Sequence, residues 1–357
     1  MITAIPRLKT RSSGKPAGRR RPRFWLLLLL LVPAIAFAWR NWPGQLSKLT
    51  EVTSFGQNPG KLRMFKYLPQ QLGASRPLVV ALHGCTQKAD AYDDETGWIK
   101  FADKYGFALL LPQEEVHQAK CFRWFDAAHI QRDQGEPMSI RQMVEKMKTD
   151  HQVDAHRIYI TGLSAGGGMT AVMLAVYPDV FAGGAIIAGI PYQCAASESE
   201  AQQKCGLFGQ ALAPEKDLTP VQWGDLVRAA TNHAGPFPRV SIWHGSSDTT
   251  VQPKDAVELM EQWTNVHGLN QTPAVDETIN GHAHKVYQDQ NGNAMVETFL
   301  INGMRHGTPV DPARSRHSFL PPASVPVFIS FVSGGWTDHE AVTQGTRHAT
   351  RTFITHC

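Results

Sequence analysis

The sequence predicts an α/β protein in which a mostly parallel sheet is flanked by helices. Short apolar runs of four to six residues recur along the chain after residue 40, and helix-period stretches separate them. Strands that alternate with helices in this way form βαβ units. The chain has 357 residues, of which 42 % are apolar and 18 % are charged, so it is long enough to bury a large core.

Each expected strand is a nearly continuous apolar run, the pattern of a strand that is buried on both faces of a parallel sheet. These runs are residues 78–82, 108–111, 157–161, 183–188, 240–243 and 296–301.

The expected helices lie between these strands, with Ser139 as an N-cap and Gly268 as a stop signal. They cover residues 96–105, 139–149, 165–176, 220–232 and 255–267. Two turn-rich insertions, 121–137 and 192–218, are expected to build the binding surface above the sheet.

The N-terminal segment 1–38 predicts export from the cytoplasm. A basic stretch precedes an apolar run that ends in the small-x-small sequence Ala36-Phe37-Ala38, typical of a cleaved signal peptide. The alternative is an uncleaved anchor, which would be the protein's one contact with a membrane. Eight of the 35 Lys and Arg residues lie in this segment, so the remainder carries 27 basic and 31 acidic residues. That balance leaves no basic stripe for nucleic acid.

The five cysteines agree with an oxidising compartment, where disulfides persist. Cys194 and Cys205 bracket a polar loop and are one plausible pair, and Cys85 with Cys121 is the second. Cys357 is then left over. Other connectivities and buried free thiols remain alternatives.

The strongest chemical signal is a buried strand that runs through Gly-x-Ser-x-Gly into a helix, at Gly162-Leu163-Ser164-Ala165-Gly166. This context is that of a nucleophile elbow, a sharp and strained turn after a central strand that exposes a serine hydroxyl above the sheet. We therefore expect Ser164 to be a nucleophile. The alternative is a glycine-rich turn in which Ser164 only caps the helix.

A serine hydroxyl needs a base, which is oriented in turn by an acid. Asp248 follows the strand at 240–243 and is the expected acid, and His306 follows the last strand and is the expected base. Asp255 and Asp276 are the rival acids. The rival bases are His282 and His284, which we place in a polar loop before the last strand.

Two backbone N–H groups are expected to stabilise the developing oxyanion. Ala165 directly follows the nucleophile, and Cys85 lies in the loop after an early strand. His83, next to that loop, is expected to support it rather than to act as a base.

No cofactor or metal is predicted. His282-x-His284 has no third ligand at a useful spacing, and there is no Cys-x-x-Cys. The run Gly166-Gly167-Gly168 lacks the acidic partner of a dinucleotide-binding fingerprint.

Five ordered motifs together resemble the poly(3-hydroxybutyrate) depolymerase family of esterases, which is related to feruloyl and acetylxylan esterases. The resemblance spans residues 62–322, and its motifs begin at Leu82, Cys121, Gly162, His244 and Met304. It implies an α/β-hydrolase catalytic domain, here residues 39–333, followed by a polar C-terminal tail at 334–357 that lacks a clear apolar stripe and whose structure the sequence does not predict.

The resemblance also implies secretion and ester hydrolysis through an acyl-enzyme. It supports Ser164, Asp248 and His306 as the catalytic residues and Cys85 with Ala165 as the oxyanion donors. Trp124 and Phe125 resemble the substrate-facing segment of the family, and with Gln87 they are the expected substrate-binding residues, although adjacent aromatics also suit a core.

A short-chain poly(3-hydroxyalkanoate) or its oligomers is the first expected substrate. Feruloyl or acetyl esters of plant polysaccharide are the second. Two further alternatives for the function are a serine peptidase and a non-catalytic surface-binding module. Polymer-degrading members append a domain that adsorbs to solid polyester, whereas some 50 residues follow His306, which argues against attack on crystalline polymer.

Overall fold

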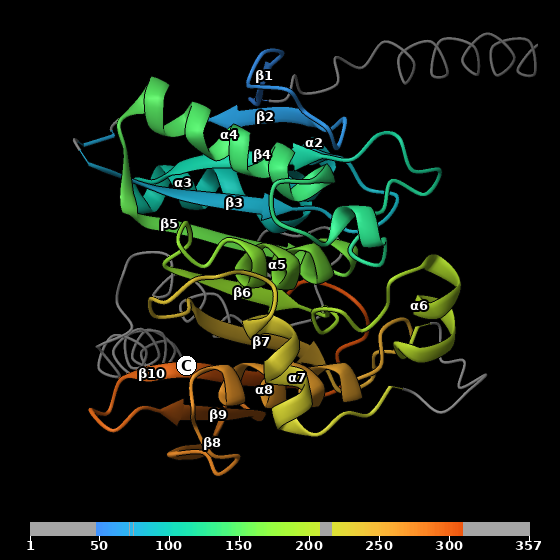
Figure 1. Cartoon of the computed structure of the whole chain (residues 1–357). Coiled ribbons are helices and arrows are strands. Elements are labelled where there is room, and N and C mark those ends of the chain that lie inside the picture. The colour runs from blue at the N-terminus through green and yellow to red at the C-terminus, as the bar shows by residue number, and fades with distance from the viewer. Residues whose placement is uncertain (1–47, 71, 74, 208–215, 310–357) are drawn as a thin grey trace, which may run out of the picture. The chain divides into compact units, whose positions relative to one another are not determined.

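A ten-stranded sheet runs through the part of the chain that the structure describes (Figure 1). The structure is a computed structural model, and it describes residues 48–70, 72–73, 75–207 and 216–309. The strand order is β1-β2-β4-β3-β5-β6-β7-β10-β9-β8. The expected export segment 1–38, the tail 334–357 and Cys357 lie outside the described residues.

The six central strands are mutually parallel and correspond to the six apolar runs of the sequence. They are β3 (Arg76–Leu82), β4 (Ala108–Gln113), β5 (Val153–Leu163), β6 (Gly183–Ile187), β7 (Arg239–Gly245) and β10 (Ala294–Ile301). This agreement confirms the predicted fold class, because a βαβ succession places consecutive strands in parallel.

Four further strands, which the sequence pattern did not indicate, extend the sheet as antiparallel edges. They are β1 (Thr50–Val52), β2 (Arg63–Tyr67), β8 (Val275–Ile279) and β9 (His282–Gln288). The expected loop position of His282 and His284 was therefore wrong, since both lie in β9. A strand at a sheet edge is partly exposed, so its sequence lacks a continuous apolar run.

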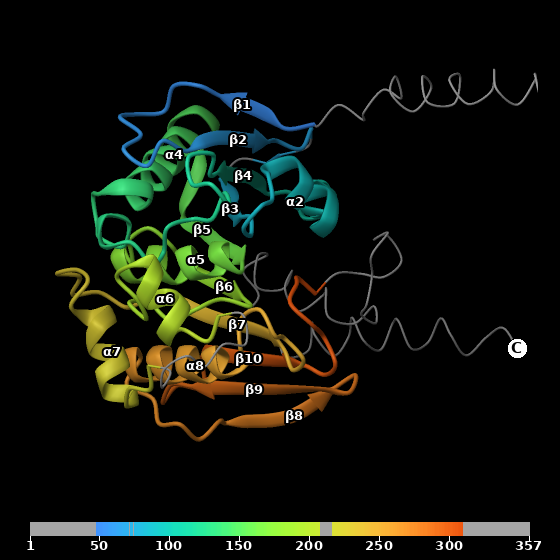
Figure 2. The same cartoon turned by 90° about the vertical axis from the view of Figure 1, so that its right-hand side faces the viewer.

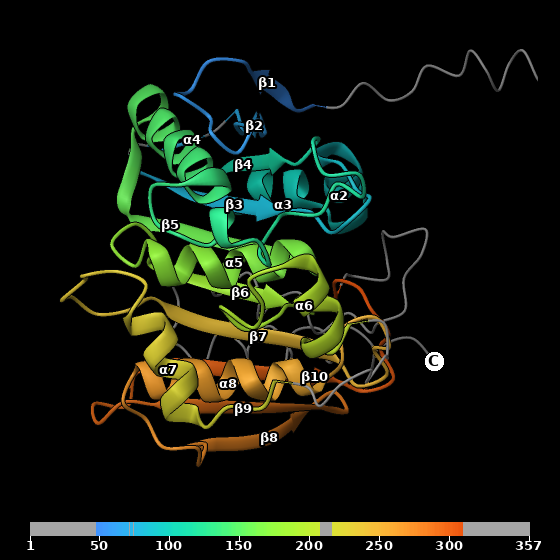
Figure 3. The same ribbon diagram turned by 45° about the vertical axis from the view of Figure 1, so that its right-hand side comes forward.

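Helices cover both faces of the sheet, as Figure 2 shows. The face with α4, α5, α7 and α8 buries one hydrophobic cluster, and the face with α2 and α3 buries the other. In Figure 3, α4, α5 and α8 run over the same face. The bounds are α2 (Ala89–Thr96), α3 (Trp98–Tyr105), α4 (Gly135–His151), α5 (Ala165–Val176), α6 (Glu198–Lys204), α7 (Pro220–Arg228) and α8 (Lys254–Val266), with a short 3-10 turn η1 (Ala127–His129).

Two helix predictions need correction. The expected helix at 96–105 is divided at Gly97, whose φ of 76° ends α2 before α3 begins. The helix expected from Ser139 begins at Gly135, so Ser139 is not its N-cap. The Ser139 hydroxyl accepts a hydrogen bond from the Gly60 N–H at 2.8 Å, which ties the N-terminal part of the chain to α4.

Two disulfides close loops at the carboxyl ends of the parallel strands. Cys85 pairs with Cys121, and Cys194 pairs with Cys205, which confirms the predicted connectivity. The first joins the loop after β3 to the insertion after β4, and the second closes the insertion that carries α6.

In the described ranges, no helix has both the length and the apolar composition that crossing a membrane requires.

Candidate active site

Ser164 lies between the last residue of β5 and the first residue of α5. Its backbone has a φ of 59° and a ψ of −118°, a left-handed region that a residue with a side chain rarely adopts. The Ser164 N–H donates to the Ile187 carbonyl oxygen of β6 at 2.9 Å. The strand, strained serine and helix expected from the sequence are therefore all present, with the side chain half-buried.

Glycine is required on both sides of this turn because other backbone segments approach too closely for a side chain. A Cβ at Gly162 would collide with the carbonyl of Gly166, and one at Gly166 would collide with the carbonyls of Leu82 and His83. The start of α5 thus packs directly against the end of β3. The same packing brings Ser164 to the loop that contains Cys85.

The predicted acid and base meet, although 58 residues separate them in the sequence. Asp248 follows β7, His306 follows β10, and Asp248 Oδ2 lies 2.8 Å from His306 Nδ1. The Asp248 side chain is fully buried, whereas that of His306 is 21 % exposed. A neutral His306 that donates its Nδ1–H to Asp248 carries its free lone pair on Nε2, the atom that a general base uses.

Backbone contacts hold the two loops together at adjacent strand ends. The Ser246 N–H donates to the Ile301 carbonyl at 3.0 Å, and the Ser247 N–H donates to the Met304 carbonyl at 3.0 Å. The Gly303 N–H donates to Ser246 Oγ at 2.9 Å. Because β7 and β10 pair in parallel, the loops that follow them both lie at the carboxyl ends of the parallel strands.

Several donors surround the Asp248 carboxylate. Oδ1 accepts the N–H groups of Thr250 at 2.8 Å and Val251 at 3.0 Å, and Oδ2 lies 3.4 Å from His244 Nε2. Burial by itself raises the pKa of Asp248, but hydrogen bonds from His244 and His306, the positive charge of His306 in its protonated form and the Thr250 amide outweigh it. The net effect holds the pKa of Asp248 below its ordinary value, so the carboxylate is ionised at neutral pH. Sequence reasoning placed His244 at the start of one of the five motifs but assigned it no role.

The loop after β3 is built to present a backbone amide. The Gly84 N–H donates to Gln87 Oε1 at 2.7 Å, and the Thr86 N–H donates to the Ala119 carbonyl at 2.6 Å. The Cys85–Cys121 disulfide links the same two segments. Among the described residues, no acceptor is present for the N–H of Cys85 or for that of Ala165 in the first turn of α5. Both predicted oxyanion donors are therefore available to a ligand.

His83 supports this loop, as predicted. Its Nδ1–H donates to the Gly84 carbonyl at 2.7 Å, and its Nε2 accepts the Glu114 N–H at 3.1 Å. Burial lowers the pKa of His83 to about 4, so the ring is neutral at neutral pH. With both ring nitrogens engaged by the backbone, His83 has no lone pair for acid–base chemistry.

The three expected substrate-binding side chains already have partners within the protein: the two aromatic rings are buried, and Gln87 is hydrogen-bonded within its own loop. Trp124 is 4 % exposed and packs against Gly168 of α5, and Phe125 is 9 % exposed and meets Trp124 edge-on at 5.4 Å between ring centroids. The Gln87 amide bonds Gly84 and Glu95, which shapes the loop around Cys85. In this conformation the two aromatic rings present little surface to a substrate.

The rival acids and bases lie in other surroundings. Asp255 is in the first turn of α8, and Asp276 in β8 pairs with Lys285 of β9. His284 lies between the carboxylates of Glu277 and Glu297, and His282 Nδ1 accepts the Asn302 N–H. The described residues contain no group of three or more His, Cys, Asp or Glu side chains that is arranged to hold a metal ion.

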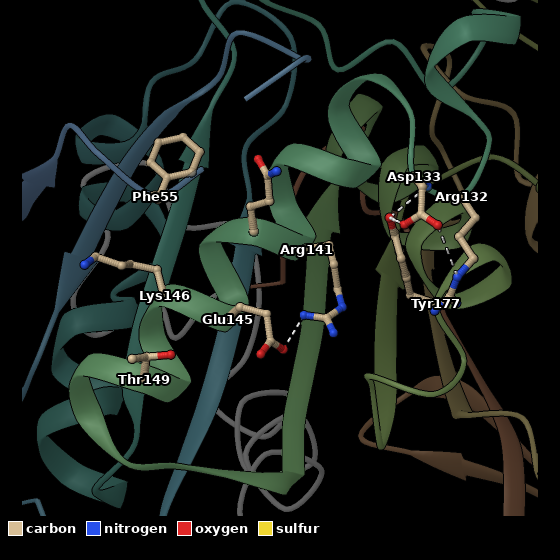
Figure 4. Close-up of a pocket in the computed structure, with 9 residues that line it drawn as sticks. Phe55, Arg132, Asp133, Arg141, Glu145, Lys146, Thr149 and Tyr177 are labelled. Atoms are coloured by element: carbon tan, nitrogen blue, oxygen red, sulfur yellow. Dashed lines mark hydrogen bonds and ion pairs between the residues drawn. The ribbon is translucent and has the colours of Figure 1, made fainter. Parts of the chain in front are cut away.

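A shallow pocket of about 420 Å³ lies along α4 (Figure 4). It reaches Tyr177, which follows the last residue of α5, about 20 Å along the helix from Ser164. Its arginines are paired, Arg132 with Asp179 at 2.7 Å and Arg141 with Glu145. This pocket is therefore separate from the catalytic candidates.

A parallel sheet with a strained serine after β5, an acid after β7 and a histidine after β10 defines the fold as that of an α/β hydrolase. The sequence model of the family described as "Esterase PHB depolymerase" matches residues 62–281, and the chain belongs to this family. The predicted family and fold are thereby confirmed.

Individual relatives agree with this membership. The chain is 51 % identical over 267 residues to Poly(3-hydroxyalkanoate) depolymerase C from Paucimonas lemoignei, an alignment that covers 74 % of this chain and 63 % of that protein. It is 34 % identical over 268 residues to Feruloyl esterase B from Thermothelomyces thermophilus, covering 74 % and 90 %. This chain therefore spans less than two thirds of the length of the Paucimonas lemoignei depolymerase.

Among solved structures, the acetyl xylan esterase from Aspergillus awamori superposes with a TM-score of 0.66 at 26 % identity. The match covers 73 % of this chain and 95 % of that one.

Proposed function

We propose that this chain is an exported serine esterase that hydrolyses carboxylic esters through an acyl-enzyme, with Ser164 as nucleophile, His306 as base and Asp248 as orienting acid. The observation that carries the proposal is the 2.8 Å contact between Asp248 and His306, at the same sheet edge as the strained serine turn. Membership of an esterase family supports the reaction type.

The proposed reaction begins when His306 Nε2 takes the proton of the Ser164 hydroxyl. The serine oxygen then attacks the ester carbonyl, and the oxyanion is held by the N–H groups of Cys85 and Ala165 at the N-terminus of α5. His306 returns the proton to the departing alcohol, which leaves an acyl group on Ser164. Water, deprotonated by His306, releases the acid by the same steps, while Asp248 stabilises the imidazolium each time.

A short-chain poly(3-hydroxyalkanoate) or its oligomers is the proposed substrate. Its support is the 51 % identity to a protein named as a poly(3-hydroxyalkanoate) depolymerase. The second candidate is a feruloyl or acetyl ester of plant polysaccharide, favoured by the relatives that are named for those esters.

Export to the periplasm or the medium is supported by the two disulfides, since such bonds persist in oxidising compartments. We retain residues 1–38 as the proposed export segment or anchor, 39–333 as the catalytic domain and 334–357 as a tail.

The test is hydrolysis by the purified full-length protein of amorphous poly(3-hydroxybutyrate), methyl ferulate and acetylated xylan, each beside the variant Ser164→Ala. We expect clearing of the polyester by the native protein and a loss of roughly 10³-fold or more in Ser164→Ala. Release of ferulate or acetate with intact polyester would move the substrate to the plant polysaccharides. Full activity in Ser164→Ala would refute the assigned nucleophile.

A further inference from the structure

One buried histidine next to the acid has no part in the reaction described above. His244 is the penultimate residue of β7, four residues before Asp248, and its side chain is completely buried. Its Nε2 lies 3.0 Å from the Val251 carbonyl oxygen and 3.4 Å from Asp248 Oδ2. Both of these oxygens accept hydrogen bonds, so Nε2 must carry a proton.

The other ring nitrogen of His244 is in a different situation. Nδ1 is buried and has no hydrogen-bond partner among the described residues. An unpaired buried polar atom is costly and is usually avoided in a core. A hydrophobic side chain would fill this place without that cost, so packing alone does not account for a histidine here.

The contacts of Asp248 show what His244 supplies. Oδ1 is fixed by two backbone amides, from Thr250 and Val251, whereas the side-chain donors to Oδ2 are His306 and His244. A carboxylate accepts about four hydrogen bonds. The two amides and His306 supply three of them, and the longer 3.4 Å contact with His244 Nε2 lies at the fourth position. His244 therefore restricts rotation of the carboxylate about its last bond, which keeps Oδ2 directed at His306.

His244 also fixes the loop that carries the other two donors. The carbonyl that it bonds belongs to Val251, whose own N–H bonds Asp248 Oδ1. Val251 pairs in turn with Leu207, next to the insertion closed by the Cys194–Cys205 disulfide. His244 Nε2–H thus joins the acid to its loop, and Val251 joins that loop to Leu207.

We propose that His244 is a positioning residue for the proposed catalytic acid, because its shared Nε2–H donor holds the Asp248 carboxylate in the orientation that aligns His306. This inference rests on the proposed function. It predicts an effect on the chemical step with little effect on substrate binding.

The test compares two amide substitutions. In His244→Gln the side-chain amide nitrogen falls near the former Nε2, whereas in His244→Asn it falls near Nδ1, where the described residues offer no partner. We expect His244→Gln to keep kcat within about 3-fold, and His244→Asn to lower kcat by about 10-fold or more with KM nearly unchanged. Equal kcat values in the two variants would overturn the proposal, whether both are high or both are low.

A measurement on the native protein covers the case in which His244→Asn fails to fold. Long-range ¹H–¹⁵N NMR should show a proton on Nε2 of His244, and a ring protonated at Nδ1 alone would overturn the proposal. Ser164→Ala is assayed in parallel. Activity retained in that variant refutes the proposed nucleophile, whereas an inactive Ser164→Ala beside equal glutamine and asparagine variants refutes the role of His244 alone.

Discussion

Individual residues at this site are positioned mainly by backbone groups. The Asp248 carboxylate accepts two main-chain amides, His83 is held between a carbonyl and an amide, and Ser164 is tied to β6 through its own N–H. Backbone partners do not change rotamer, so the side chains that they hold have little freedom. This arrangement lets a site assembled from separate loops keep its geometry.

At this scale we predict the effect of Asp248→Asn. The amide places an N–H where His306 Nδ1–H now donates, so the ring changes tautomer and loses its free Nε2 lone pair. We expect kcat to fall by roughly 10³- to 10⁴-fold in an ester assay, with the protein still folded. Asp276→Asn is the matched control, because Asp276 lies on the edge strand β8, away from His306, and pairs with Lys285 of β9. Similar activities in the two variants would rule out Asp248 as the acid.

Secondary-structure elements meet at the start of α5, where the chain offers no room for side chains. The first turn of this helix lies against the carbonyls that end β3, and the contact brings Ser164 next to the loop with Cys85. The relation between the proposed nucleophile and the proposed oxyanion donors is therefore a property of how one helix packs on two strands.

At this scale we predict the effect of Gly166→Ala. The added methyl group collides with the carbonyls of Leu82 and His83, and α5 must shift away from β3. Overpacking of this kind costs about 1–3 kcal/mol, so the melting temperature should fall, and kcat/KM should fall by about 10-fold or more. Gly73→Ala is the control, since a Cβ there meets nothing within 4 Å. If Gly166→Ala behaves like Gly73→Ala, the close packing is not needed.

At the scale of the whole molecule, buried histidines couple folding to pH, and His83 is one of them. Burial lowers its pKa from 6.5 to about 4, so the unfolded chain binds a proton that the folded chain does not. The resulting stability is fully present above pH 6.5 and is lost as the pH falls towards 4.

We therefore predict that His83→Asn reduces the acid sensitivity of folding. This variant removes the titrating ring and retains a donor near Nδ1 for the Gly84 carbonyl. It should be less stable than the native protein at pH 7, but between pH 7 and pH 4 it should lose less stability, by up to about 3 kcal/mol. Denaturant unfolding at both pH values measures the difference. Parallel losses in the two proteins would contradict the neutral, buried state of His83.

The parallel strands could be predicted because the apolar residues within each strand are enough to indicate that it is buried. Most of their positions are buried on both faces, so apolar residues dominate the six central runs, although Glu297 and Thr298 interrupt the last of them. The edge strands could not be predicted in this way. In β8 the three central residues are exposed, and in β9 histidines and a lysine interrupt the apolar pattern. Their pairing depends on the neighbouring strand, which a local window of sequence does not contain.

By itself, the sequence determined the fold class and the serine turn between strand and helix, because each leaves a local motif in the chain. It also predicted the order of the proposed nucleophile, acid and base, and it offered the observed cysteine pairs as one of several connectivities. Only the tertiary structure decided that Asp248 and His306 touch, that Trp124 and Phe125 are buried, and that His244 donates towards the acid. These are contacts between residues that lie on different elements or loops. Their distances follow from how strands pair and helices pack, and no single segment of the sequence specifies them.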